Sequence, residues 1–231
     1  MNFITLFEFT PFELLESILP YLNKDELLSF LAFYDIKGRM NWNVIYSLRF
    51  DKIKNNINYD NYMHWLSLEK LKSELTLKCE LEQLDNSKQL NLSATNLNVL
   101  PKEIGNLTNL EEINLNGNNL VFLPEEISNL KNLQRLYLSY NKLISLPEGI
   151  VGLVNLQLLY LSGNKLTNIP EGIGQLINLN ALTLENNNLT YIPEGIKQLI
   201  NLQTLYLANN NLSDLEQQKI KNCLPQSYIN F

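Results

Sequence analysis

The chain has 231 residues, and 45% of them are apolar, which is enough to bury a core in one elongated domain or in a solenoid joined to a small helical domain. Its formal net charge is −6, and no basic stripe alternates with aromatic residues, so we expect no nucleic-acid partner. One histidine, His64, and two distant cysteines, Cys79 and Cys223, exclude a multi-histidine metal site and predict no metal or cofactor.

The N-terminal segment, residues 1–15, does not have the pattern of a secretory signal. It lacks a basic start, and Glu8 and Glu13 interrupt its apolar residues. No apolar run in the chain approaches the ~18 residues of a membrane span, so we expect no membrane partner. We therefore expect a cytoplasmic protein, in the host cytoplasm if the source is a virus or an intracellular bacterium.

Residues 10–50 predict three short helices. The first begins at Thr10, which caps it while Glu13 reaches back to the cap, and Pro11 occupies the first helical position. Pro20 limits this helix, and Asn23 starts the second by the same capping logic. The third covers residues 41–50.

The run from Pro11 to Leu28 resembles the opening of an F-box, a three-helix module that docks on a Skp1-like adaptor of a cullin ubiquitin ligase. The matching positions, to which the resemblance assigns adaptor docking, are Pro11, Leu14, Leu15, Ile18, Leu19, Leu27 and Leu28. The sequence departs from that family at Thr10, where leucine is usual. The alternative is that these helices only cover the N-terminal end of the solenoid; an exposed apolar patch would favour docking.

An asparagine-rich link, residues 55–61, precedes a fourth predicted helix through Trp65, Leu68, Leu71 and Leu75. We expect residues 1–60 to form the helical, F-box-like domain and residues 61–86 to form the link and the N-terminal cap of a solenoid. Residues 87–215 then hold the repeats, and residues 216–231 form the C-terminal cap.

From residue 87 onward, one pattern recurs six times at an interval of 23 residues. The alternation at Leu136-Tyr137-Leu138 predicts a short strand with one buried face. An asparagine follows each strand from the second coil on, and we expect these asparagines to form a ladder that satisfies buried backbone groups: Asn118, Asn141, Asn164, Asn187 and Asn210. A proline then begins a return leg that cannot be a central strand.

The pattern L-x-x-L-x-L-x-x-N-x-L resembles the leucine-rich repeat family in its short Leu-Pro form. The resemblance implies an α/β repeat fold, a right-handed solenoid with parallel inner strands, next to the all-helical N-terminal domain. A coil cannot bury its own apolar face, so both ends of the stack need covers. At the C-terminus, an amphipathic helix is predicted through Leu215, Ile220, Cys223 and Leu224, with Ile229 and Phe231 in a final extended segment.

Strand residues that face away from the core are the candidate partner-binding residues. With Tyr140, which follows a strand, they are Glu112, Asn114, Arg135, Tyr137, Leu158, Tyr160, Thr183, Thr204 and Tyr206. Tyrosines recur at one strand position in three of five coils, and tyrosine supplies contact area and a hydroxyl at low entropic cost. The alternative is that tyrosine simply pairs well across neighbouring strands.

No catalytic constellation is visible, because adjacent pairs such as Glu111-Glu112 do not converge on a cleft. We predict a non-catalytic protein–protein interaction module. The leading hypothesis is a substrate-recruiting F-box and leucine-rich repeat adaptor of a cullin-type ubiquitin ligase, with a Skp1-like protein and a substrate as partners. The alternative is a scaffold or a small-GTPase regulator whose helices only cap the solenoid, because the Leu/Ile-Pro repeat is similar to that of the Ras-interacting group.

Overall fold

The computed structural model describes residues 59–77 and 81–231. The three helices predicted within residues 10–50 lie outside this part of the chain, as do the residues assigned to adaptor docking: Pro11, Leu14, Leu15, Ile18, Leu19, Leu27 and Leu28. The chain divides into two compact units, Met1–Leu66 and Ser67–Phe231, and the architecture below is that of the second unit.

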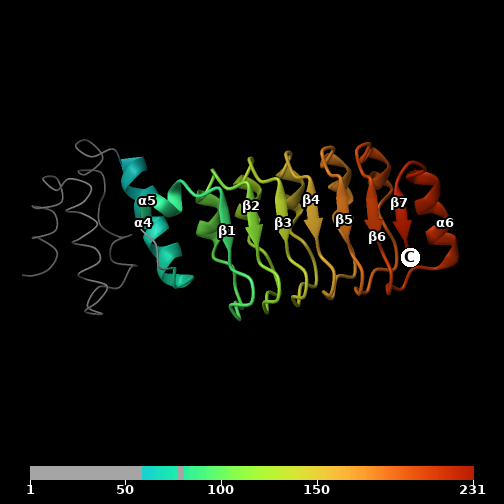
Figure 1. Ribbon diagram of the computed structural model, residues 1–231, viewed down its shortest axis with the longest axis horizontal. Coiled ribbons are helices and arrows are strands. Elements are labelled where there is room, and N and C mark those ends of the chain that lie inside the picture. The colour runs from blue at the N-terminus through green and yellow to red at the C-terminus, as the bar shows by residue number, and fades with distance from the viewer. Residues whose placement is uncertain (1–58, 78–80) are drawn as a thin grey trace, which may run out of the picture. The chain divides into compact units, whose positions relative to one another are not determined.

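The second unit contains a parallel sheet of seven strands that pair in chain order (Figure 1). The strands are β1 (Gln89–Asn91), β2 (Glu112–Asn114), β3 (Arg135–Tyr137), β4 (Leu158–Tyr160), β5 (Ala181–Thr183), β6 (Thr204–Tyr206) and β7 (Tyr228–Asn230). From β1 to β6 each residue pairs with the residue 23 positions later, as Arg135 does with Leu158. The repeat length of the sequence is therefore the register of the sheet, and the predicted parallel inner strands are confirmed.

The return leg of five coils is a short 3-10 helix. These helices are η4 (Lys102–Asn106), η5 (Glu125–Asn129), η6 (Glu148–Gly152), η7 (Glu171–Gln175) and η8 (Glu194–Gln198). Each follows a proline with φ between −55° and −70°, the range in which the proline ring holds φ. The prediction that this leg is not a central strand is confirmed, although the sequence pattern did not predict a helix.

The core consists of leucines and isoleucines that recur in each coil and are buried between neighbouring coils. In β4, Leu159 is fully buried while Leu158 and Tyr160 on either side are half-buried. Leu161 and Ile173 of the same coil are also fully buried. The return legs approach so closely that a β-carbon on Gly174 would overlap the carbonyl oxygen of Gly195, so this position requires glycine.

The asparagines that follow the strands form the predicted ladder, which we call the inner asparagine row: Asn118, Asn141, Asn164, Asn187 and Asn210. Asn164 shows its bonding: Nδ2 donates to the carbonyl oxygens of Leu138 and Leu161, both at 2.9 Å, and Oδ1 accepts from the amide of Leu143 at 3.0 Å. In the first coil, Thr95 stands at this position, and its hydroxyl donates to the carbonyl oxygen of Leu92 at 2.9 Å. Each side chain thus pairs backbone groups that the turn would leave without partners.

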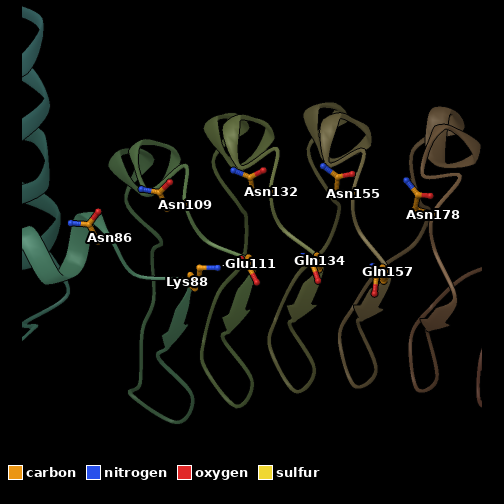
Figure 2. Close-up of a pocket in the computed structure, with 9 residues that line it drawn as sticks. All are labelled: Asn86, Lys88, Asn109, Glu111, Asn132, Gln134, Asn155, Gln157 and Asn178. Carbon is orange, nitrogen blue, oxygen red and sulfur yellow. Dashed lines mark hydrogen bonds and ion pairs between the residues drawn. The ribbon is translucent and has the colours of Figure 1, made fainter.

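A second series of asparagines precedes the strands, and we call it the outer asparagine row: Asn109, Asn132, Asn155, Asn178 and Asn201. Each donates from Nδ2 to a carbonyl oxygen 24 residues earlier, at 2.8–3.0 Å. Figure 2 shows four of them in line beside the 3-10 helices. This row was not among the features predicted from the sequence. The signal was present, because an asparagine recurs every 23 residues directly before a buried leucine.

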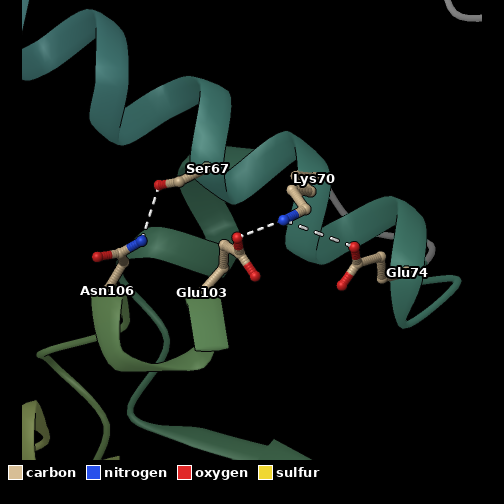
Figure 3. Close-up of polar contacts among 5 residues, drawn as sticks. All are labelled: Ser67, Lys70, Glu74, Glu103 and Asn106. Atoms are coloured by element: carbon tan, nitrogen blue, oxygen red, sulfur yellow. Dashed lines mark hydrogen bonds and ion pairs between the residues drawn. The ribbon is translucent and has the colours of Figure 1, made fainter. Parts of the chain in front are cut away.

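Helices α4 (Tyr59–Glu74) and α5 (Leu81–Asp85) precede the first coil. Leu68, Leu71 and Leu75 are buried, which confirms the predicted fourth helix and its apolar side. From α4, Lys70 Nζ lies 2.5 Å from Glu103 Oε1, and Ser67 Oγ accepts a hydrogen bond from Asn106 at 2.8 Å (Figure 3). Residues 67–75 therefore join the outer leg of the first coil by apolar and polar contacts.

The C-terminal end is covered by helix α6 (Asp214–Cys223) and strand β7. Ser213 caps α6, since its Oγ accepts a hydrogen bond from the amide of Glu216. The helix and the final extended segment were predicted, but the apolar side assigned to the helix was wrong at Leu215, which is 68% exposed. Leu215 lies five residues before the buried Ile220, about 140° around the helix, and so faces away from the last coil.

Candidate protein-binding surface

The strands expose one side of the sheet as a regular surface, which we call the inner face. In β2 to β6, the middle residue is buried and the residues before and after it are half-buried. The first row across the strands is Glu112, Arg135, Leu158, Ala181 and Thr204, and the second is Asn114, Tyr137, Tyr160, Thr183 and Tyr206. The predicted strand residues therefore do lie side by side on one accessible surface.

The second row is dominated by aromatic rings in contact. Tyr137 and Tyr160 pack edge to face, with ring centroids 5.2 Å apart and an interplanar angle of 85°. Tyr206 makes a similar contact with Tyr228 of β7, at 6.0 Å and 63°. Such pairs contribute about 0.5–1.5 kcal/mol beyond burial and hold the rings in place. Tyr228 was not predicted as a residue of the inner face, because the C-terminal segment breaks the 23-residue interval.

Thr183 separates the two tyrosine pairs. Its hydroxyl oxygen accepts hydrogen bonds from Ser162 Oγ at 2.9 Å and from the amide of Leu161 at 3.3 Å. With Ala181 as the other half-buried residue of β5, this strand presents only small side chains between Tyr160 and Tyr206. The inner face therefore has large aromatic rings on both sides of β5, which presents only small side chains.

Charged residues gather at the N-terminal end of the inner face. Arg135 Nε donates to Glu112 Oε2 at 2.6 Å, and this hydrogen bond raises the pKa of the Arg135 guanidinium. Beside it, Lys88 Nζ lies 2.8 Å from Glu111 Oε1, which raises the pKa of Lys88. Partial burial, followed by the charge of Glu112, raises the pKa of Tyr137. Its protonated hydroxyl can donate a hydrogen bond to a partner.

Tyr140 lies outside β3, in the turn that follows it. Its side chain is 70% exposed, and its φ of +58° is unusual for a residue of this size. Its ring lies against Gly163 of the next coil, where a β-carbon would come within 2.8 Å of Tyr140 Cδ1. The predicted binding residue Tyr140 is therefore at the edge of the inner face rather than on a strand.

A polar groove of about 690 Å³ runs along the other edge of the inner face, where the strands begin (Figure 2). It is lined by residues of the outer asparagine row and by the side chains that precede the strands: Asn86, Lys88, Asn109, Glu111, Asn132, Gln134, Asn155, Gln157 and Asn178. The lining is mainly amides, and its two charged members, Lys88 and Glu111, form an ion pair. The inner face therefore lies between a polar edge and the edge that carries Tyr140.

Within residues 59–77 and 81–231, no three histidine, cysteine, aspartate or glutamate side chains converge in a way that could bind a metal ion. In the same ranges, no helix has both the length and the apolar character that a bilayer crossing requires.

Comparison with known proteins agrees with this architecture. The leucine-rich repeat family matches residues 109–166 and 154–212. A solved leucine-rich repeat protein of Leptospira interrogans is 44% identical over 64% of this chain, with a TM-score of 0.64, and the match spans 38% of that longer protein. The leucine-rich repeat ectodomain of a receptor kinase from Arabidopsis thaliana is 25% identical over 63% of this chain and 92% of its own length, with a TM-score of 0.52.

None of the curated proteins matches the chain in sequence. The family match does not include residues 11–28, so the F-box resemblance stays a prediction. The repeated strands, the inner asparagine row and the family match all concern the same coils. Residues 109–212 are therefore a leucine-rich repeat region, a type of protein-interaction module that is typically non-catalytic.

Proposed function

We propose that this chain binds a partner protein through the inner face, with Tyr137 and Tyr160 at the centre of the contact. The observation that carries the proposal is the edge-to-face contact of these two half-buried rings on neighbouring strands of the parallel sheet. Rings that are held before binding lose little conformational entropy when a partner covers them. Tyrosines with fixed positions are also frequent among the residues that dominate binding energy.

The area of the inner face sets a requirement on the partner. Seven strands at ~4.8 Å spacing extend about 29 Å, and a strand of three residues at ~3.3 Å per residue makes the strip roughly 10 Å wide, or about 300 Å² before side-chain relief. A stable interface needs about 800 Å² on each partner. We therefore propose that a stable partner also covers loops after the strands, which expose apolar side chains in the first three coils: Val99, Val121, Phe122, Tyr140 and Ile144.

The test is purification of the tagged full chain from cells of its source organism, beside the double variant Tyr137→Ala plus Tyr160→Ala. We expect the wild-type chain to retain a protein that the double variant loses. Tyr191→Ala is the matched control, because Tyr191 is an exposed tyrosine that lies outside the inner face. Retention of the same proteins by all three chains would contradict the proposal.

The finer role that we propose is recruitment of a substrate to a cullin-type ubiquitin ligase in the cytoplasm. It is supported by the residue pattern from Pro11 to Leu28, which resembles an F-box. The corresponding experiment adds Leu14→Asp plus Ile18→Asp to the same purification. A Skp1-like protein that is retained by the wild-type chain and lost by this variant would support the adaptor role. Recovery of a small GTPase without any Skp1-like protein would favour the scaffold alternative.

A further inference from the structure

The turns that follow β1 to β6 share one position with positive φ, which recurs every 23 residues, and the first turn has a second such residue, Asn96. The six residues, with φ between +55° and +70°, are Ala94, Gly117, Tyr140, Gly163, Asn186 and Asn209. Glycine and asparagine adopt this left-handed conformation readily, whereas a bulky residue adopts it at a cost in free energy. Tyr140 is therefore the residue least suited to its backbone position in the series.

Neither burial nor hydrogen bonding offsets this cost at Tyr140. The side chain is 70% exposed, and its hydroxyl has no hydrogen-bond partner among the described residues. In two later coils the same position does make a local bond, since Asn209 Nδ2 donates to Asn186 Oδ1 at 3.0 Å. Backbone strain that the fold does not require is a recognised feature of functional positions.

The ring of Tyr140 nevertheless has a defined position. It rests on Gly163, and a β-carbon there would come within 2.8 Å of Tyr140 Cδ1. Tyr140 follows Tyr137 by three residues and thus stands at the edge of the inner face. An exposed ring held in this way can insert into a partner with little further loss of entropy.

We infer that Tyr140 is a specificity-determining residue of the inner face, and that its partner is a folded protein with an apolar pocket for this ring. The inference rests on the proposed function, because it assumes that a protein covers the inner face. The inference predicts that Tyr140 lowers the stability of the fold and strengthens binding of the partner. A smaller residue compatible with positive φ stabilises the fold and weakens binding.

The experiment compares Tyr140→Asn with the wild-type full chain. We expect Tyr140→Asn to raise the urea midpoint of unfolding and to lower affinity at least about tenfold for the protein whose retention depends on Tyr137 and Tyr160. Ala94→Asn is the matched control, because it relieves positive φ at the same turn position of the first coil without removing a ring. It is expected to raise the midpoint and to leave affinity unchanged.

Each alternative result has a distinct meaning. A lower urea midpoint for Tyr140→Asn would show that the ring stabilises the fold, and it would overturn the inference. Unchanged affinity for Tyr140→Asn, with weaker binding by Tyr137→Ala plus Tyr160→Ala, would overturn the inference and leave the proposed function standing. Equal binding by all of these variants would overturn both.

Discussion

The two asparagine rows use the same side chain, the same 23-residue interval and the same kind of hydrogen bond, but in different surroundings. Asn118, Asn141, Asn164 and Asn187 of the inner row are buried, and Asn210, in the last coil, is half-buried. Each of the five makes at least three hydrogen bonds to backbone groups, as Asn164 does. The outer row, as at Asn155, is exposed and makes one.

The same repeated residue is therefore required by the fold in the inner row and is a surface feature in the outer row. A buried backbone group without a partner costs about 1–3 kcal/mol, whereas an exposed one binds water instead. The inner row therefore fixes the turn of every coil. The outer row leaves amide side chains along the polar groove, where substitution is tolerated.

The largest expected effect is at the centre of the inner row. Asn164→Ala removes the acceptor of the Leu143 amide, together with one of the two side-chain donors to the carbonyl oxygens of Leu138 and of Leu161. Because the buried Leu143 amide is left without a partner, we expect the free energy of unfolding to fall by about 1–3 kcal/mol, measured by urea denaturation. A loss below about 1 kcal/mol would mean that water replaces the side chain. The two rows would then not differ in their contribution to stability.

A double-mutant cycle measures whether neighbouring asparagines of the inner row depend on each other. Asn141 and Asn164 both donate to the carbonyl oxygen of Leu138, at 3.1 and 2.9 Å. Loss of one donor leaves this oxygen paired and loss of both does not, so Asn141→Ala plus Asn164→Ala should cost about 1 kcal/mol more than the sum of the single variants.

The corresponding pair in the outer row, Asn132 and Asn155, donates to two different carbonyl oxygens, those of Thr108 and Lys131. Asn132→Ala plus Asn155→Ala should therefore be additive within about 0.5 kcal/mol in the same urea experiment. Coupling of equal size in both pairs would show that the rows are not different in kind.

The smallest expected effect is a single substitution in the outer row. Asn155→Ala removes one exposed hydrogen bond to the carbonyl oxygen of Lys131, and water can replace it. We expect a loss of at most about 1 kcal/mol in the free energy of unfolding. A larger loss would assign the outer row a part in holding the coils together.

Much of this contrast was visible in the sequence, because the regular interval determines the register. The strands, the inner row and the exposed side of Tyr137 and Tyr160 follow from alternation and from the need to pair buried backbone groups. The sequence does not determine features that depend on local geometry between coils. The 3-10 form of the return legs, the positive φ of Tyr140 and its contact with Gly163 are of this kind.

The two ends of the stack were harder to predict than its middle, because each end occurs only once and does not follow the repeated pattern. Leu215 continues the interval from Ile192, yet it is exposed because the chain enters α6. Tyr228 pairs with Thr204 of the first row, 24 residues earlier instead of 23, and its ring contacts Tyr206 of the second row. The adaptor-docking positions Leu14 and Ile18 lie outside the described residues and remain predictions.

Photo-crosslinking of the full chain in cells of its source is the decisive test of whether the inner face binds a partner protein. A photoreactive amino acid replaces Tyr206 on the inner face in one chain and Asn155 in the polar groove in another, with Tyr137 and Tyr160 intact in both. The account predicts a crosslinked protein from position 206 and none from position 155. Crosslinking from position 155 alone, or equally from both positions, would contradict it.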